Sequence, residues 1–319
     1  MAKVYVARPI PEVGVDLLKG KFDVEVNPEN KVLSKDELKE AVRGVDAILS
    51  LLTDKINGEV LDAAGSQLKV VANYAVGYDN IDVEAAKQKN VMVTNTPGVL
   101  TEAVTEHAIG LMFAAAKSVV GADKYTRGGE YKQWEPKGFL GPQITGKTLG
   151  VVGLGRIGSM VAQVAHAGLK MNILYFDVKR NEEFESRVEA KYKELDDILK
   201  EADFISIHVP LLPATKHLIN SEKLKLMKKS AVLINTSRGP VVDERALVEA
   251  LKNKEIWAAG LDVYENEPEL SPGLADLPNV VLTPHTASAT FEARDAMSKI
   301  AAENIIAVLE GQTPPNLVK

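Results

Sequence analysis

The chain has 319 residues, no cysteine and a formal net charge of −6, with 45% hydrophobic and 26% charged residues. This length and composition are ordinary for a globular protein of about two domains. The missing cysteine excludes disulfides, thiolate metal sites and cysteine nucleophiles, and we expect no metal site of another kind. Because no basic run is long enough to follow a phosphate backbone, nucleic acid is excluded as an expected partner.

No segment approaches the roughly 18 consecutive apolar residues of a membrane span. The first residues, "MAKVYVARPIPE", enter a strand-like run without the basic-then-apolar layout of a signal peptide. The sequence therefore predicts a cytoplasmic protein with no membrane partner.

Short apolar runs alternate with amphipathic helical patterns over the first hundred residues. We expect strands at 3–8, 22–26, 45–50 and 68–74. The helical pattern at 34–44 opens with a capping box, Ser34 with Glu37 three residues later, and Gly44 is a candidate stop. Such alternation favours a parallel sheet with helices on both faces.

A second series of strands follows a long helical pattern at about 101–120 and a polar, glycine-rich interruption at 127–147. Its strands are expected at 148–154, 172–176, 203–209, 231–235, 258–263 and 280–282. A last helical pattern covers 291–309. The two series of alternating strands and helices predict two α/β units. Periodicity leaves open which of the two units the last helix joins.

The stretch "TLGVVGLGRIGSM" contains Gly153, Gly155 and Gly158 in the spacing GxGxxG. A strand pattern precedes it and a helical pattern at 156–168 follows, which is the context of a dinucleotide-binding loop. The first glycine allows the tight turn, the second lets the backbone approach a pyrophosphate, and the third lets helix and strand pack closely. The helix N-terminus then offers free N–H groups to the phosphates. The alternative is a strand–helix turn without a ligand.

Asp177 ends the next predicted strand, about 20 residues beyond the loop. An acidic residue at this distance binds the ribose hydroxyls and repels a 2′-phosphate, so NAD(H) is the preferred cofactor. Lys179 and Arg180 follow closely and leave NADP(H) open.

Three polar residues follow strand-like runs in the second half: Arg238, Glu267 and His285. Ligands of open α/β sheets bind beyond the carboxyl ends of the strands, which directs all three toward one crevice. Arginine binds a carboxylate or a polarised carbonyl, and histidine exchanges a proton near neutral pH while a carboxylate orients its ring. Beside a nicotinamide this set is suited to reducing a 2-oxo acid. Alternatively, His285 is only a turn residue, Arg238 caps a loop, and Glu267 belongs to a solvated acidic stretch.

The motifs "VGLGRIG", "NTSRGPVVDERAL", "AAGLDVYENEP" and "VVLTPHTAS" together resemble those of the D-isomer-specific 2-hydroxyacid dehydrogenases. The resemblance covers nearly the whole chain and is greatest to the glyoxylate/hydroxypyruvate reductases, notably at "NYAVGYDNID". It implies two Rossmann-like, doubly wound parallel-sheet domains with a cleft between them. The substrate domain would combine 1–99 with 288–319, and the dinucleotide-binding domain would be 100–287. It also implies a homodimer with the helix after residue 100 and the following excursion at the interface.

The resemblance implies a role for each matching position. Arg238 would bind the substrate carboxylate and carbonyl oxygen, His285 would be the proton donor in reduction, and Glu267 would pair with it. The backbone of Val76 and Gly77 would hold the substrate carboxylate, and Leu52 would line the pocket. Further cofactor contacts are implied for Thr105, Arg156, Ile157, Val209, Pro210, Thr236 and Asp262. His107, in the "EH" motif, would be structural.

The activity implied is NAD(P)H-dependent reduction of glyoxylate or hydroxypyruvate. A D-lactate or D-3-phosphoglycerate dehydrogenase would use the same three residues, and pocket shape decides between these substrates. A protein of another class, an NAD-sensing corepressor-like binding protein, would share the fold without turnover.

Overall fold

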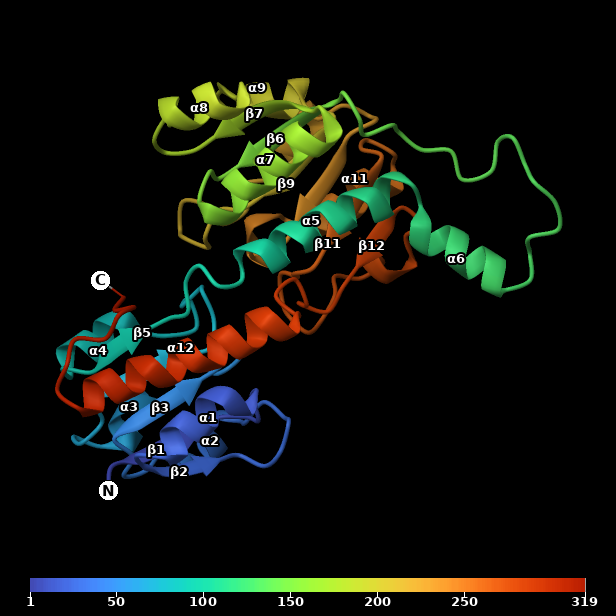
Figure 1. The fold of residues 1–319 in the computed structure, drawn as a ribbon. Helices are drawn as coiled ribbons and strands as arrows, with labels where there is room; N and C mark the ends of the chain where they lie inside the picture. The colour runs from blue at the N-terminus through green and yellow to red at the C-terminus, as the bar shows by residue number, and fades with distance from the viewer. Residues whose placement is uncertain (319) are drawn as a thin grey trace. The chain divides into compact units, whose positions relative to one another are not determined.

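The computed structural model describes residues 1–318, and this part of the chain forms two compact units. Unit 1 combines residues 1–100 with the C-terminal segment that starts at Ala289, and unit 2 is Thr101–Ser288. Each unit contains one parallel β-sheet with helices on both of its faces (Figure 1). The prediction of two Rossmann-like α/β sheets is therefore confirmed.

The sheet of unit 1 has five parallel strands in the order β2-β1-β3-β4-β5. They are β1 (Lys3–Val6), β2 (Asp23–Val26), β3 (Ala47–Ser50), β4 (Val70–Asn73) and β5 (Met92–Thr94). The strand order reverses between β1 and β3, and ligands of such sheets bind at this point, beyond the carboxyl ends. The three-residue β5 was not predicted from the sequence, because so short a run has little periodicity.

Helices cover both faces of this sheet. α2 (Lys35–Ala41), α3 (Gly58–Ala64) and α4 (Val83–Gln88) share a core with Ile48 and Val71. Side chains alternate along a strand, so the neighbouring residues face α1 (Glu12–Lys19) and α12 (Phe291–Leu309). Gly14 lets α1 and α12 approach closely, because a Cβ there would lie 2.1 Å from the Ser298 carbonyl oxygen. The capping box of Ser34 and Glu37 is present as predicted.

The sheet of unit 2 has seven parallel strands in the order β12-β11-β10-β9-β6-β7-β8. They are β6 (Thr148–Val152), β7 (Asn172–Phe176), β8 (Lys191–Tyr192), β9 (Phe204–Ile207), β10 (Val232–Asn235), β11 (Ala258–Leu261) and β12 (Val280–Leu282). β8 was not predicted and is a two-residue edge strand. The order reverses at β6, so the glycine loop that follows β6 lies where a doubly wound sheet binds its ligand.

Two buried clusters hold the helices of unit 2 to its sheet. α5 (Thr101–Ala116), α7 (Arg156–Leu169) and α8 (Glu182–Val188) pack on one face, where Val232 and Ile234 contribute. α9 (Leu195–Glu201), α10 (Ser221–Leu226) and α11 (Glu244–Lys252) pack on the other, where Leu233 contributes. Two short 3₁₀ helices, Gly239–Val241 and Leu274–Asp276, lie in the loops. β9 and β10 are buried along their whole length, and most of their residues are apolar because both faces of each strand are covered.

The predicted helix at about 101–120 is wrong in one respect. α5 ends at Ala116, Ser118 takes a left-handed backbone with φ +50°, and a separate helix, α6 (Val119–Arg127), follows. The reason is tertiary, because α5 packs on the sheet whereas α6 buries none of its residues and extends away from the sheet of its unit (Figure 1). Within residues 1–318 no single helix is long and apolar enough to cross a membrane, and α5 with α6 passes that test only jointly, across a 63° bend.

Candidate active site

The glycine loop joins β6 to α7 and each of its three glycines has a distinct environment. Gly153 has φ +95°, a region that favours glycine. A Cβ on Gly158 would lie 2.0 Å from the Gly153 carbonyl oxygen, so the turn closes only without a side chain there. A Cβ on Gly155 would meet nothing within 4 Å, and the loop therefore leaves open space beside the first N–H groups of α7. That space is suited to a pyrophosphate.

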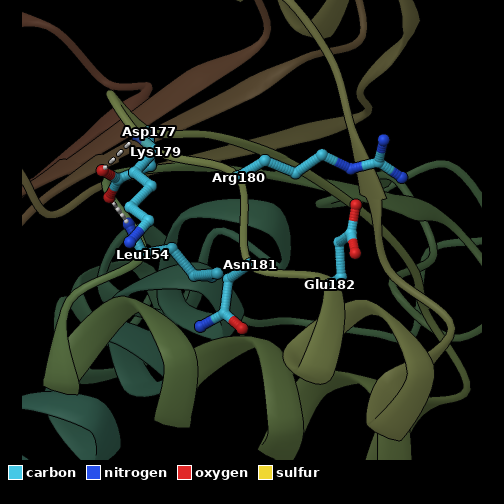
Figure 2. Close-up of a pocket in the computed structure, with 6 residues that line it drawn as sticks. All are labelled: Leu154, Asp177, Lys179, Arg180, Asn181 and Glu182. Carbon is cyan, nitrogen blue, oxygen red and sulfur yellow. Dashed lines mark hydrogen bonds between the residues drawn. The ribbon is translucent and has the colours of Figure 1, made fainter.

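Asp177 follows β7 and connects that strand end to the loop. Its Oδ2 accepts the Leu154 N–H at 2.6 Å, and its Oδ1 faces the Lys179 N–H at 3.5 Å. A pocket of about 510 Å³ opens here, lined by Leu154, Asp177, Lys179, Arg180, Asn181 and Glu182 (Figure 2). The carboxylate thus lies at the edge of a cavity next to the glycine loop.

Arg180 is in this pocket lining, but its guanidinium is bound elsewhere. It makes two hydrogen bonds to the Glu185 carboxylate, at 2.8 and 2.7 Å, and extends away from Asp177 (Figure 2). The hydrogen bond from Arg180 is the main reason that the pKa of Glu185 is lowered to about 2, with a second from Tyr175. Lys179 and Arg180 were the two basic residues that left NADP(H) open, and Arg180 is paired with Glu185.

Two buried hydroxyls of unit 2 have no hydrogen-bond partner among the described residues. They are Thr105 Oγ1 on α5 and Thr236 Oγ1 after β10, and both residues were predicted to contact the cofactor. A buried hydroxyl without a partner is costly unless a ligand or water satisfies it. Together with the open space at Gly155 and the carboxylate of Asp177, they fit a bound dinucleotide. The remaining predicted contacts lie at strand ends or at the start of α7: Arg156, Ile157, Val209 and Pro210.

His285 and Glu267 form a hydrogen-bonded pair. His285 Nδ1 lies 2.8 Å from Glu267 Oε2, and both side chains are partly exposed. The other oxygen of Glu267 accepts the Tyr264 N–H at 3.0 Å, which fixes the carboxylate. Because the carboxylate accepts from Nδ1–H, the second ring nitrogen, Nε2, is left for a reactant.

The backbone of His285 is itself unusual. Its φ is +54°, in the left-handed region, and its N–H donates to the carbonyl oxygens of Asp262 and Thr283 at 2.9 and 3.0 Å. Non-glycine residues remain in this region only where their surroundings hold them. The strand ends at Leu282, and the next residues turn the imidazole toward Glu267.

Asp262 supports the loop that carries His285. It is fully buried and accepts the N–H groups of Thr286 and Ala287 at 2.8 Å each, together with the Thr283 hydroxyl at 2.6 Å. Burial alone would raise the pKa of Asp262, but these bonds and His107 hold it below its ordinary value. Within residues 1–318, Oδ2 accepts only the Ala287 N–H, so this oxygen retains an acceptor position for the predicted carboxamide contact.

His107 connects α5 to the same loop. Its Nε2 lies 2.9 Å from the Thr283 hydroxyl and 3.3 Å from Asp262 Oδ1. A structural role was expected for His107, but these partners were not. The signal was weak, since a histidine on a helix does not reveal which loop packs against it.

Arg238 follows β10, next to β11 and β12, whose loops carry Glu267 and His285. Asn235 Nδ2 donates to the Arg238 carbonyl at 3.0 Å, and the guanidinium Nη1 donates to the Ser237 carbonyl at 2.9 Å. Gly239 lies against the Glu267 loop, because a Cβ there would be 1.8 Å from the Tyr264 carbonyl oxygen. Unit 2 therefore packs the loop of Arg238 against the loop of Glu267.

The predicted substrate contacts Leu52, Val76 and Gly77 belong to unit 1. Leu52 lies in the loop after β3, and Val76 and Gly77 lie in the loop after β4. These strands are neighbours in the parallel sheet, so both loops lie at its carboxyl edge. All three residues are partly exposed.

Comparisons with known proteins assign the chain to a family. Residues 109–287 match the family model "D-isomer specific 2-hydroxyacid dehydrogenase, NAD binding domain". A glyoxylate reductase of Pyrococcus furiosus is 49% identical over 99% of this chain and 95% of its own. A crystal structure of a protein from Thermus thermophilus has a TM-score of 0.93 and 42% identity, covering 99% of this chain and 100% of that one.

A further solved structure contains a dinucleotide. It is the NADPH-dependent glyoxylate/hydroxypyruvate reductase of Sinorhizobium meliloti in complex with NADP and malonate, with a TM-score of 0.86 and 32% identity over 99% of this chain and 96% of that one. The glycine loop and the pair of His285 with Glu267 lie within the matched NAD-binding region. This chain belongs to the D-isomer specific 2-hydroxyacid dehydrogenase family and is an NAD(P)-dependent enzyme of that family.

Proposed function

We propose that this enzyme reduces a small 2-oxo acid, glyoxylate or hydroxypyruvate, to the 2-hydroxy acid with NADH. The observation that carries the proposal is the hydrogen bond between His285 and Glu267, at 2.8 Å, in a domain built to hold a dinucleotide. The names of the Pyrococcus furiosus glyoxylate reductase and the Sinorhizobium meliloti glyoxylate/hydroxypyruvate reductase support the substrate class. In this proposal unit 2 holds the cofactor and unit 1 contributes the substrate-carboxylate loop.

His285 is the proton donor. Glu267 accepts Nδ1–H and stabilises the imidazolium, so that Nε2–H is given to the alkoxide oxygen that develops at C2. A bound reduced nicotinamide supplies the hydride. In oxidation the neutral imidazole takes the proton back at the same nitrogen. This assignment uses the observed pairing of His285 at Nδ1.

Arg238 and the backbone of Val76 and Gly77 bind the substrate anion. The guanidinium forms charge-assisted hydrogen bonds to the carboxylate and to the oxygen that becomes negative, which stabilises the transition state more than the ground state. The N–H groups of Val76 and Gly77 hold the carboxylate, and Leu52 restricts the size of the group attached to C2.

The dinucleotide contacts follow the fit described above. The pyrophosphate is held by the glycine loop and the start of α7, which includes Arg156 and Ile157. The adenine lies between Val209 and Pro210. The phosphates are also contacted by Thr105, and the nicotinamide end of the cofactor is contacted by Thr236 and Asp262. Asp177 binds the ribose hydroxyls and would repel a 2′-phosphate. Because Arg180 is paired with Glu185, we propose NADH as the preferred cofactor.

We further propose that the protein is a homodimer joined through residues 118–147, here called the arm. α6 buries no residue, and the arm exposes Val119, Val120, Tyr131, Trp134, Phe139 and Leu140, with 77% of Trp134 accessible. So many apolar side chains in one segment are typical of an interface. A second copy of the chain is the partner that the family resemblance implies.

The proposed substrate is tested by steady-state oxidation of NADH and NADPH with glyoxylate, hydroxypyruvate, pyruvate and 3-phosphohydroxypyruvate. We expect the largest kcat/KM with glyoxylate or hydroxypyruvate, and a larger value with NADH than with NADPH. Preference for pyruvate or the phosphorylated acid would refute the substrate assignment. Binding of NADH without turnover of any acid would instead indicate a sensor protein.

A further inference from the structure

The loop at 75–78 in unit 1 is held by the side-chain amides of two asparagines. Asn73, at the end of β4, is fully buried and donates from Nδ2 to the Gly77 carbonyl oxygen at 2.8 Å. Asn95, just after β5, donates from Nδ2 to the Val76 carbonyl oxygen at 2.7 Å. The Thr96 N–H donates to the Ala75 carbonyl oxygen at 2.9 Å. Three consecutive carbonyls are thus bound from within unit 1.

These bonds determine where the neighbouring N–H groups point. In a planar trans peptide, the carbonyl of one residue and the N–H of the next point in opposite directions. Fixing the Ala75 carbonyl therefore aims the Val76 N–H, and fixing the Val76 carbonyl aims the Gly77 N–H. In the described residues 1–318, neither of these two N–H groups donates a hydrogen bond. Both residues are partly exposed, and two adjacent N–H groups without an acceptor are suited to binding an anion.

The amide of Asn73 is itself fixed by further hydrogen bonds. Its Oδ1 accepts the Ser50 hydroxyl at 3.0 Å, and its Nδ2 also donates to Asn80 Oδ1 at 3.0 Å. Asn80 Nδ2 in turn donates to the carbonyl oxygens of Leu51 and Asp54, at 3.0 Å each. The loop after β4 is thereby connected to the loop after β3, which carries Leu52.

Asn95 is held from the C-terminal part of the chain. Its carbonyl oxygen accepts Asn304 Nδ2 of α12 at 3.4 Å, and its N–H donates to the Asn316 carbonyl oxygen at 3.3 Å. Asn304 is fully buried, and its Oδ1 accepts the Asn316 N–H at 3.1 Å. The position of Asn95 therefore depends on contacts within unit 1.

We propose that Asn73 and Asn95 are positioning residues for substrate-carboxylate recognition: they hold residues 75–78 so that the Val76 and Gly77 N–H groups are aligned before the substrate arrives. This inference rests on the proposed function, since it concerns the loop assigned to the carboxylate. Prealigned donors lose less conformational freedom on binding and so give tighter binding of the anion. An amide suits this task because it donates without adding a negative charge beside the substrate anion.

The test compares Asn95→Ala and Asn73→Ala with Asn27→Ala in the full-length, NADH-loaded enzyme. Asn27 is the matched control, because it is buried in unit 1 and its Nδ2 donates to the Ala7 carbonyl oxygen at 3.0 Å, away from the loop. Three properties are measured for each variant: KM and kcat for glyoxylate, the Kd of oxalate as an unreactive carboxylate, and the Kd of NADH. If Asn73→Ala does not fold, the half-buried Asn95 decides the result.

We expect KM and the oxalate Kd to rise about tenfold or more in both variants, the effect of losing one well-placed hydrogen bond. Saturating kcat should change by less than about threefold, and the NADH Kd should not change, because both amides bind backbone groups of unit 1 whereas the dinucleotide loop belongs to unit 2. Asn27→Ala should leave all of these constants unchanged.

A folded Asn95→Ala enzyme with unaltered KM and oxalate Kd would overturn the proposal, as would an equal rise in Asn27→Ala. If the parent turns over no 2-oxo acid, the proposed function fails, and the oxalate Kd values still decide this inference. A parent that binds no oxalate would overturn the inference as well.

Discussion

At the scale of single residues, one loop carries the proposed proton donor, and buried side chains hold that loop. His285 takes a left-handed backbone, and Asp262 binds the loop on either side of it through the N–H groups of Thr286 and Ala287 and the hydroxyl of Thr283. These bonds hold the backbone of His285, and the backbone sets the direction in which the imidazole leaves the main chain. Such fixing is what a general acid requires, because a proton is transferred only over hydrogen-bond distance.

His208 provides a pH test of the native structure. It follows β9, its Nε2 lies 2.8 Å from the Ser206 hydroxyl, and burial lowers its pKa to about 4. Between its unfolded pKa of about 6.5 and pH 4, the unfolded chain therefore binds a proton that the native chain does not. Stability should fall as the pH is lowered through this window, by up to about 3 kcal/mol from this residue.

The measurement is the difference in thermal or denaturant stability between the parent and His208→Gln at pH 7 and at pH 4. Gln cannot titrate, so the parent should lose more stability than the variant across this range. Equal losses in the two proteins would show that His208 does not resist protonation in the folded state.

The sequence indicated the candidate residues Arg238, Glu267 and His285 but not how they are supported. Each follows a strand, and parallel strands end at a common edge, which is why these three became candidates. The bonds of Asp262 to residues 283–287, the contact of His107 with Thr283 and the amides of Asn73 and Asn95 were not foreseen. They depend on which atoms meet after packing, and neither periodicity nor spacing contains that information.

At the scale of elements, close backbone contacts hold the loops of the site. Gly239→Ala should be strongly destabilising, by several kcal/mol, because its Cβ would overlap the Tyr264 carbonyl of the Glu267 loop. Gly168→Ala is the control. Gly168 lies near the end of α7 with open space around its Cβ position, so the same change should stabilise the protein by about 0.5–1 kcal/mol.

Both variants are compared by denaturant unfolding and by kcat with glyoxylate. Gly239→Ala should lose activity together with stability, whereas Gly168→Ala should retain the activity of the parent. Equal stability of the two variants would contradict the close packing of the Arg238 and Glu267 loops.

Element boundaries show where local signals suffice. The last helix was predicted at 291–309 and is observed there, and the capping box sets the start of α2. The break at Ser118 was missed because "AAAKSVV" contains no glycine or proline. Helix-compatible residues continue through it, and the change of packing partner ends α5. Short edge strands such as β8 were missed because two residues have no measurable period.

At the scale of the whole molecule, the arm should govern assembly. A homodimer has about twice the 34.5 kDa mass of the chain, near 69 kDa. Trp134→Ser combined with Leu140→Ser removes two of the most exposed apolar side chains of the arm and should shift the protein toward the monomer. Light scattering coupled to size exclusion, over a range of concentrations, measures this change.

Val32→Ser is the matched control, because Val32 is also half-exposed but lies in unit 1 outside the arm. It should leave the mass unchanged. A parent protein of 34.5 kDa at all concentrations, or a double variant with the same mass as a dimeric parent, would contradict the proposed interface.

The central claim is that His285, paired with Glu267, supplies the proton when a 2-oxo acid is reduced. The most direct measurement is kcat for glyoxylate reduction by His285→Ala, with NADH binding and thermal stability measured on the same sample. We expect kcat to fall at least about 100-fold, the usual contribution of a positioned general acid, while the Kd of NADH stays that of the parent. A folded, NADH-binding His285→Ala enzyme with near-parental kcat would contradict the claim.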